Sequence, residues 1–140
     1  MADGPAEHFL FKDEAFRLRG AVFHVYRSMG PGFLEAVYQE CLAIEFGRRS
    51  IPFEQQKMLA LAYEGQPLRQ TYAADFVCFG GIIIEIKAAR AIAPEHRAQL
   101  LNYLNATGCE LGLLVNFRHY PGLEYERLVT GEQEVDDVYL

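Results

Sequence analysis

The chain has 140 residues, 51% of them hydrophobic and 13% aromatic, with a formal net charge of −6 at pH 7. This predicts one domain with a buried core and excludes an intrinsically disordered chain. No apolar run approaches the roughly 20 residues of a membrane-spanning helix, and the first residues lack the pattern of a secretory signal. The three cysteines form no CxxC pair, so we expect reduced thiols in a cytoplasmic protein, with no disulfide framework or zinc knuckle.

The negative charge lies mostly at the two ends of the chain. Residues 1–14 contribute −3 and residues 131–140 contribute −4, which leaves +1 for the rest. A neutral body neither supports nor excludes a polyanionic substrate. We expect the acidic segment 131–140 to be a solvated tail on a body of about 7–130, and the whole of 1–140 to hold a single domain.

Apolar residues at three- and four-residue spacing predict a helix over about 7–28 and another over about 33–49, separated by Gly30-Pro31-Gly32. Extended segments follow, with turns at Gly65-Gln66-Pro67 and Gly80-Gly81. Pro94 opens a third helix, which ends before Gly108. The expected strands are about 53–63, 70–79, 82–88, 111–117 and 125–129. The order ααβββαββ predicts an α/β fold, with a mixed central β-sheet flanked by helices.

The apolar run that begins at Ile82 ends in two charged residues, Glu85 and Lys87. Side chains alternate across a strand, so these two share one face. Ionisable groups at the end of an apolar strand are costly to desolvate unless they have partners. The simpler interpretation is a charged strand end that reaches solvent.

Asp75 joins this pair in one of two hairpin registers. A two-residue turn at Gly80-Gly81 pairs Asp75 with Ile86 and turns it away from Glu85. A three-residue turn over 79–81, with Gly81 left-handed in a bulge, puts Asp75 directly opposite Glu85, with β-carbons about 5 Å apart. Two carboxylates that close require a proton or a cation between them. The second register therefore predicts a divalent-metal site, and Mg²⁺ fits its oxygen ligands.

The predicted roles follow from this second register. Asp75 and Glu85 ligate the metal, joined by the backbone carbonyl of Ile86. A metal so bound polarises a phosphate and lowers the pKa of a bound water. Lys87 orients or activates that water and offsets the charge that develops on phosphorus.

Asp75 followed by Glu85-x-Lys87 resembles the PD-(D/E)XK nuclease superfamily, and the run from Gly32 to Tyr38 is similar to the signature of the bacterial GxxExxY branch. The resemblance extends over about 16–129 and implies a restriction-endonuclease-like core. It implies a metal-dependent nuclease that uses Mg²⁺, with Mn²⁺ as a substitute, on nucleic acid, DNA slightly favoured over RNA. It also implies that Glu35 is a further acidic ligand.

The position of Glu35 at the edge of its helix's apolar stripe predicts that it faces inward. Glu45 lies nearer the centre of that stripe and is the alternative buried acid. On the helix after the E-x-K strand, the resemblance implies that Gln99 places substrate or water and that Tyr103 lines the site. Relatives often carry a basic residue where Ala73 stands. In the three-residue register Ala73 is opposite Lys87, so a phosphate contact is missing.

Two other classes of function remain open at this point. One is a non-catalytic nucleic-acid-binding or regulatory module that retains the nuclease fold. The other is a homodimeric scaffold in which the charged cluster is a structural ion pair. The intact Asp75, Glu85, Lys87 and Gln99 favour the nuclease, whereas the neutral body and Ala73 favour the other two.

Overall fold

The computed structural model describes residues 11–130 and 138–139. Its helices are α2 (Lys12–Met29), α3 (Glu35–Arg48) and α4 (Pro94–Thr107). Its strands are β1 (Phe53–Tyr63), β2 (Gln66–Cys78), β3 (Ile82–Lys87), β4 (Leu111–Asn116), β5 (Glu124–Val129) and β6 (Val138–Tyr139). None of the helices in this part of the chain combines the length and apolar character needed to span a membrane.

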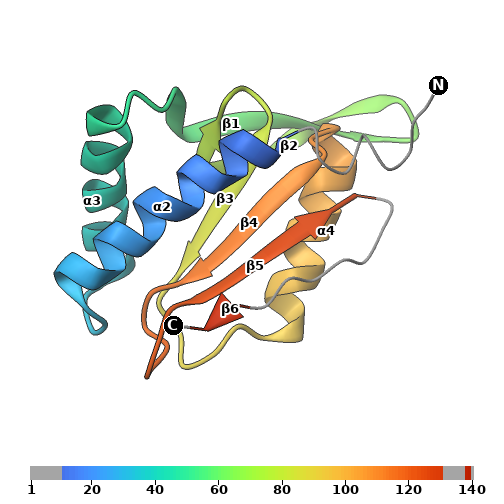
Figure 1. Ribbon diagram of the computed structural model, residues 1–140. Coiled ribbons are helices and arrows are strands. Elements are labelled where there is room, and N and C mark those ends of the chain that lie inside the picture. The colour runs from blue at the N-terminus through green and yellow to red at the C-terminus, as the bar shows by residue number, and fades with distance from the viewer. Residues whose placement is uncertain (1–10, 131–137, 140) are drawn as a thin grey trace.

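The strands form one mixed sheet in the order β1-β2-β3-β4-β5-β6. β3 and β4 are parallel, and the other neighbouring pairs are antiparallel. A parallel pair requires a crossover connection, and α4 provides it. α2 and α3 pack on one face of the sheet and α4 on the other (Figure 1). This is the predicted α/β fold, with a mixed sheet and flanking helices.

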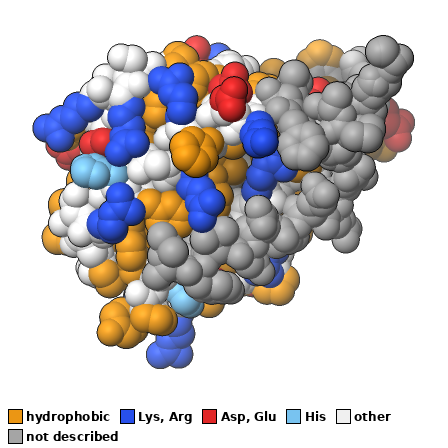
Figure 2. Space-filling model, in the orientation of Figure 1, with side chains coloured by type: hydrophobic (Ala, Val, Ile, Leu, Met, Phe, Trp, Pro, Cys, Tyr) orange, Lys and Arg blue, Asp and Glu red, His pale blue; other side chains and the backbone are white. Residues whose placement is uncertain are grey.

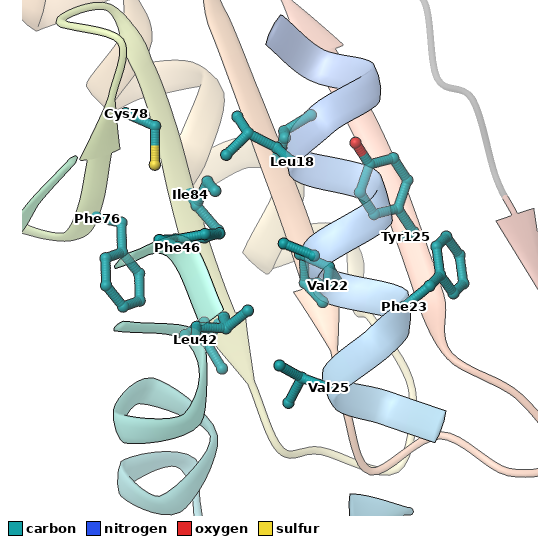
Figure 3. Packing of buried hydrophobic residues seen from close by; sticks show 14 of the residues in the cluster. Leu18, Val22, Phe23, Val25, Leu42, Phe46, Phe76, Cys78, Ile84 and Tyr125 are labelled. Atoms are coloured by element: carbon teal, nitrogen blue, oxygen red, sulfur yellow. The ribbon is translucent and has the colours of Figure 1, made fainter. Parts of the chain in front are cut away.

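Each face of the sheet has its own hydrophobic core. On the first face, side chains from α2 and α3 point toward the sheet (Figure 3). The labelled members of this core are Leu18, Val22, Phe23, Val25, Leu42, Phe46, Phe76, Cys78, Ile84 and Tyr125. On the second face, Leu100 and Leu104 of α4 pack against Ile83 and Leu114. Because β3 and β4 are covered on both faces, they read as continuous apolar runs.

Several predicted boundaries were wrong. β2 begins at Gln66, because the hairpin turn is formed by Glu64 and Gly65, both with positive φ (46° and 82°), and Tyr63 pairs with Gln66. A two-residue turn with positive φ at both positions matches the twist of the strands it joins. Near the C-terminus, β6 pairs with β5, although its residues lie in the segment predicted as a solvated tail. Residues 7–10 of the first predicted helix lie outside the described residues.

Candidate active site

The hairpin between β2 and β3 has the three-residue register. Cys78 pairs with Ile82, and the Gly81 N–H donates to the Cys78 carbonyl at 3.2 Å. The left-handed residue was predicted wrongly. Phe79 (φ 54°) and Gly80 (φ 73°) have positive φ, because they are the two residues inside the turn that Gly81 closes. The Phe79 N–H donates to the Pro52 carbonyl at 3.0 Å, which helps to hold this conformation.

Beyond the pair Phe76–Ile84, the ladder between β2 and β3 stops, and the two strands separate. We call this separation the split. Asp75 and Glu85 flank it, so they are neighbours but not the ladder pair that the sequence predicted. The Ile86 N–H donates to Asp75 Oδ2 at 2.8 Å, and the Asp75 N–H donates to Glu85 Oε1 at 3.1 Å. Each carboxylate thus accepts a backbone N–H of the other strand, as a backbone carbonyl of its own strand would in a regular ladder.

The split coincides with a change of face in β1 and β2. In a regular strand, residues separated by an even number of positions point to the same face. Phe53 and Leu59 lie six positions apart in β1 yet belong to different cores. Tyr72 and Phe76 lie four positions apart in β2 and also belong to different cores. Both strands therefore change face between these positions, where Gln56 has a positive φ of 52°. The outer part of the β1–β2 hairpin then packs against α4.

Glu85 lies on the α4 side of the split and is partly buried. It accepts a hydrogen bond from the Tyr72 hydroxyl, and the Tyr72 ring stacks on Tyr103 of α4, with centroids 3.6 Å apart and planes 6° apart. The pKa of Glu85 is raised to about 7, chiefly by burial and secondly by the neighbouring Asp75 carboxylate. Hydrogen bonds from Tyr72 and the Asp75 N–H, and the charge of Lys87, partly oppose this rise. Burial, with the charge of Glu85, also raises the pKa of Tyr72.

Two glutamines that the sequence analysis did not single out hold Asp75. Gln39 Nε2 of α3 donates to Asp75 Oδ1 at 2.9 Å, and Gln56 Nε2 of β1 donates to the same oxygen at 3.3 Å. Gln39 lies one helical turn after Glu35, so the two share a helix face. That spacing is the sequence signal that could have identified Gln39.

Glu35 is exposed, which contradicts the predicted inward orientation. It lies in the first turn of α3, where its neighbours are exposed too, and the buried face of the helix begins at Tyr38. Glu35 Oε2 accepts the Ala88 N–H at 3.2 Å, so it contacts the chain just after β3. In residues 11–130, no three His, Cys, Asp or Glu side chains converge as a metal site.

Glu45 is the buried acid of α3, with 8% of its surface exposed. Arg49 Nε donates to its Oε2 at 2.7 Å, and this hydrogen bond is the main reason why the pKa of Glu45 is lowered. Burial partly opposes that shift. Glu45 is therefore one partner of an ion pair with the residue that follows α3.

The remaining predicted residues differ in how they are linked to the split. Lys87 ends β3 on the same strand face as Glu85 and is partly exposed. Tyr103 contacts Glu85 indirectly, through Tyr72, whereas Gln99 lies exposed on α4. Ala73 pairs with Met58 of β1 and not with Lys87, because β2 has already left β3 at that point.

The donors at the split suit a hard divalent cation. Asp75 and Glu85 supply carboxylate oxygens, and a backbone carbonyl such as that of Ile86 is a third oxygen of the kind that Mg²⁺ and Mn²⁺ accept. Burial and, after it, the Asp75 carboxylate raise the pKa of Glu85, and a bound cation would favour its charged form. The chemistry of these donors fits a metal, while Glu35 does not join them as a third acid.

Comparison with known proteins gives a family and a fold. The model of the PD-(D/E)XK nuclease superfamily matches residues 12–128. The solved crystal structure of SSO0001 is similar, with a TM-score of 0.52 and 20% sequence identity over 70% of this chain. At that identity the likeness concerns the fold alone, and this chain spans half the length of that one. No match was found among curated proteins.

Proposed function

We propose that this chain, which belongs to the PD-(D/E)XK nuclease superfamily, is a metal-dependent nuclease that hydrolyses nucleic-acid phosphodiesters. The observation that carries the proposal is the exchange between Asp75 and Glu85 across the split, with each carboxylate beside the backbone of the other's strand. DNA is slightly favoured over RNA, by analogy with the superfamily.

Asp75 and Glu85, with the Ile86 carbonyl, are the proposed ligands of Mg²⁺ or Mn²⁺. A cation bound there supplies Lewis acidity toward a phosphate oxygen and lowers the pKa of a water. Lys87, on the same strand face as Glu85, orients the attacking water and offsets charge on the phosphate. Tyr72 holds Glu85 through its hydroxyl, while Gln39 and Gln56 hold Asp75. Gln99 and Tyr103 are proposed to contact the substrate.

We also propose that the chain belongs to the GxxExxY branch, and the structural role of each signature residue supports this. Gly32 has a φ of 111°, which favours glycine. Glu35 accepts the N–H of Ala88 after β3. Tyr38 is fully buried, donates to the Gly30 carbonyl at 2.5 Å and accepts the Phe33 N–H at 3.2 Å. The signature thus fixes the loop between α2 and α3 against the end of β3.

The test joins metal binding to cleavage. Purified protein is titrated with Mn²⁺ or Mg²⁺ by calorimetry, then incubated with single- and double-stranded DNA and RNA, with metal or with chelator. We expect metal binding that Asp75→Ala and Glu85→Ala abolish, and cleavage that Lys87→Ala reduces at least a hundredfold. Glu40→Ala, at an exposed acid of α3, is the matched control and retains both. Cleavage that persists in all three site variants would refute the assignment of these residues.

A non-catalytic nucleic-acid-binding module is the second candidate, and one observation favours it. The Asp75 carboxylate already accepts hydrogen bonds from Ile86, Gln39 and Gln56, and Glu35 stands apart from it. A module of this kind binds oligonucleotides equally well with metal and with chelator and cleaves none of them. The same experiment therefore separates the two candidates.

A further inference from the structure

Three loops meet where β3 ends. The α2–α3 loop ends at this point, because Glu35, the first residue of α3, accepts the Ala88 N–H. The β4–β5 loop reaches it through the Phe117 N–H, which donates to the Lys87 carbonyl at 3.0 Å. The β3–α4 loop is held there by Asn116, whose side chain exchanges two hydrogen bonds with the backbone of Ala89 at 2.8 and 3.0 Å. All three loops thus adjoin the strand that carries Glu85 and Lys87.

The first two loops also pack on each other. Tyr38 stacks on Phe117, with centroids 4.3 Å apart and planes 9° apart, and Phe33 contacts the same Tyr38 edge-on at 6.0 Å. The Tyr26 hydroxyl, near the end of α2, donates to the His119 carbonyl at 3.2 Å. Tyr38, which is fully buried at the junction of the two loops, holds them in a fixed arrangement.

The outer surface of these loops is apolar and basic. Tyr120 is 80% exposed, Leu34 77% and Phe33 44%. Three arginines are exposed on neighbouring segments: Arg27 in the last turn of α2, Arg90 in the β3–α4 loop and Arg118 in the β4–β5 loop. Figure 2 shows hydrophobic side chains next to a Lys or Arg side chain at the lower end of the molecule, where Figure 1 places the α2–α3 and β4–β5 loops. We call this surface the loop corner: Phe33, Leu34 and Tyr120 with these three arginines.

We propose that the loop corner binds a single-stranded segment of nucleic acid that leaves the Asp75–Glu85 site. Bases stack on Tyr120 and Phe33, and the arginines contact phosphates. The inference rests on the proposed function for the position of the cleaved strand. It adds a substrate class, namely nucleic acid with an unpaired segment of a few nucleotides beside the cleavage point.

The chemistry of the loop corner selects this partner. Exposed rings offer flat apolar surfaces on which any unpaired base can stack, whereas the bases of a duplex are already stacked on each other. Guanidinium groups pair with phosphates, and such contacts do not distinguish one base from another. The corner also adjoins the end of β3, two residues beyond Glu85, because Glu35 accepts the Ala88 N–H and Phe117 donates to the Lys87 carbonyl.

The test measures binding without cleavage. A fluorescent 12-nucleotide single strand and the matching duplex are titrated with the wild-type protein in chelator, and anisotropy gives each dissociation constant. We expect tighter binding of the single strand, weakened about tenfold by Tyr120→Ala, because that variant removes a ring on which a base stacks. Tyr63→Ala, which removes a tyrosine 65% exposed at the end of β1, is the matched control and leaves affinity unchanged.

The arginines are tested in the same assay. Arg118→Ala weakens single-strand binding and lowers the slope of log affinity against log salt by about 0.7, whereas Arg69→Ala, in β2, changes neither. Equal loss from Tyr120→Ala and Tyr63→Ala would overturn the proposal, as would preference for the duplex. A sedimentation experiment adds a further criterion: a dimer that Tyr120→Ala converts to a monomer identifies the loop corner as a contact between copies of this chain and likewise overturns it.

Failure of the proposed nuclease function and failure of the loop-corner proposal give different results. Binding that depends on Tyr120 and Arg118, with no cleavage on adding Mn²⁺, supports the loop corner and rejects the nuclease. Cleavage that requires Glu85, with binding indifferent to Tyr120, supports the nuclease and rejects the loop corner.

Discussion

Replacing Glu85 with glutamine removes the charge at the split and keeps the shape of the side chain. The amide oxygen of a glutamine can still accept the hydrogen bonds that Tyr72 and the Asp75 N–H donate to Glu85. What disappears is the cost of holding a second carboxylate, partly buried, beside Asp75. Glu85→Gln therefore isolates that electrostatic cost.

The magnitude follows from the pKa of Glu85, which is about 7 in the folded protein against an ordinary value of 4.5. Between these values the unfolded chain loses the proton while the folded chain keeps it. Stability therefore falls as pH rises through this window and stays lower above pH 7. At 1.36 kcal/mol per pKa unit, the loss amounts to about 3 kcal/mol.

The assay is urea unfolding of the wild type and Glu85→Gln in chelator, from pH 4.5 to pH 8. The two proteins should have similar free energies of unfolding at pH 4.5, and Glu85→Gln should be more stable by up to about 3 kcal/mol at pH 8. Adding Mn²⁺ at pH 8 should narrow the gap by stabilising the wild type. Glu40→Gln, at an exposed acid, controls for loss of charge alone. A stability difference that does not change with pH would refute the reasoning.

Three further predictions concern the body of the fold. Tyr38→Phe keeps the ring stack but leaves two backbone groups of the α2–α3 loop without the hydroxyl, and it should lower the free energy of unfolding by about 1–3 kcal/mol; an unchanged urea midpoint would contradict this. Arg97→Met removes the two hydrogen bonds that Arg97 donates to Glu126, which is 1% exposed, and should cost about 3–5 kcal/mol, most of it recovered in the double variant with Glu126→Leu; no recovery would mean that lost packing dominates. Burial raises the pKa of Cys78 to about 12, so a thiol reagent at pH 8 should label the other two cysteines first, and mass spectrometry that finds Cys78 labelled in the native protein would count against its burial.

The site shows why some residues could be predicted and others could not. Glu85 and Lys87 follow from a local rule, strand alternation, and Asp75 joins them in one of the two turn lengths that the sequence allows. Gln39 acts from another element, and its contact with Asp75 depends on how α3 packs against the sheet. Tyr72 is similar, because it reaches Glu85 only after β2 changes face.

Two acids show that burial depends on the position of a residue along its helix as well as on the apolar stripe predicted from periodicity. Glu35 was expected to face inward because of its place in the periodic pattern, yet it lies in an exposed first turn. Glu45, one alternative considered for the buried acid, is buried, but an ion pair with Arg49 accounts for it. Periodicity gives the direction of a side chain around its helix. It does not say where along the helix the covered part begins.

The sequence alone determined the order of elements and the strand that carries Glu85 and Lys87, and it limited the hairpin that brings Asp75 near them to two registers, of which the structure has the three-residue one. These features depend on neighbours within about ten residues along the chain, through alternation, turn length and the stops at glycine and proline. Only the tertiary structure decided that β2 leaves β3 at Asp75, that carboxylates replace carbonyls there, and that three loops meet beyond Lys87. Those features depend on how both cores fill the two faces of the sheet, which is a property of contacts between distant segments.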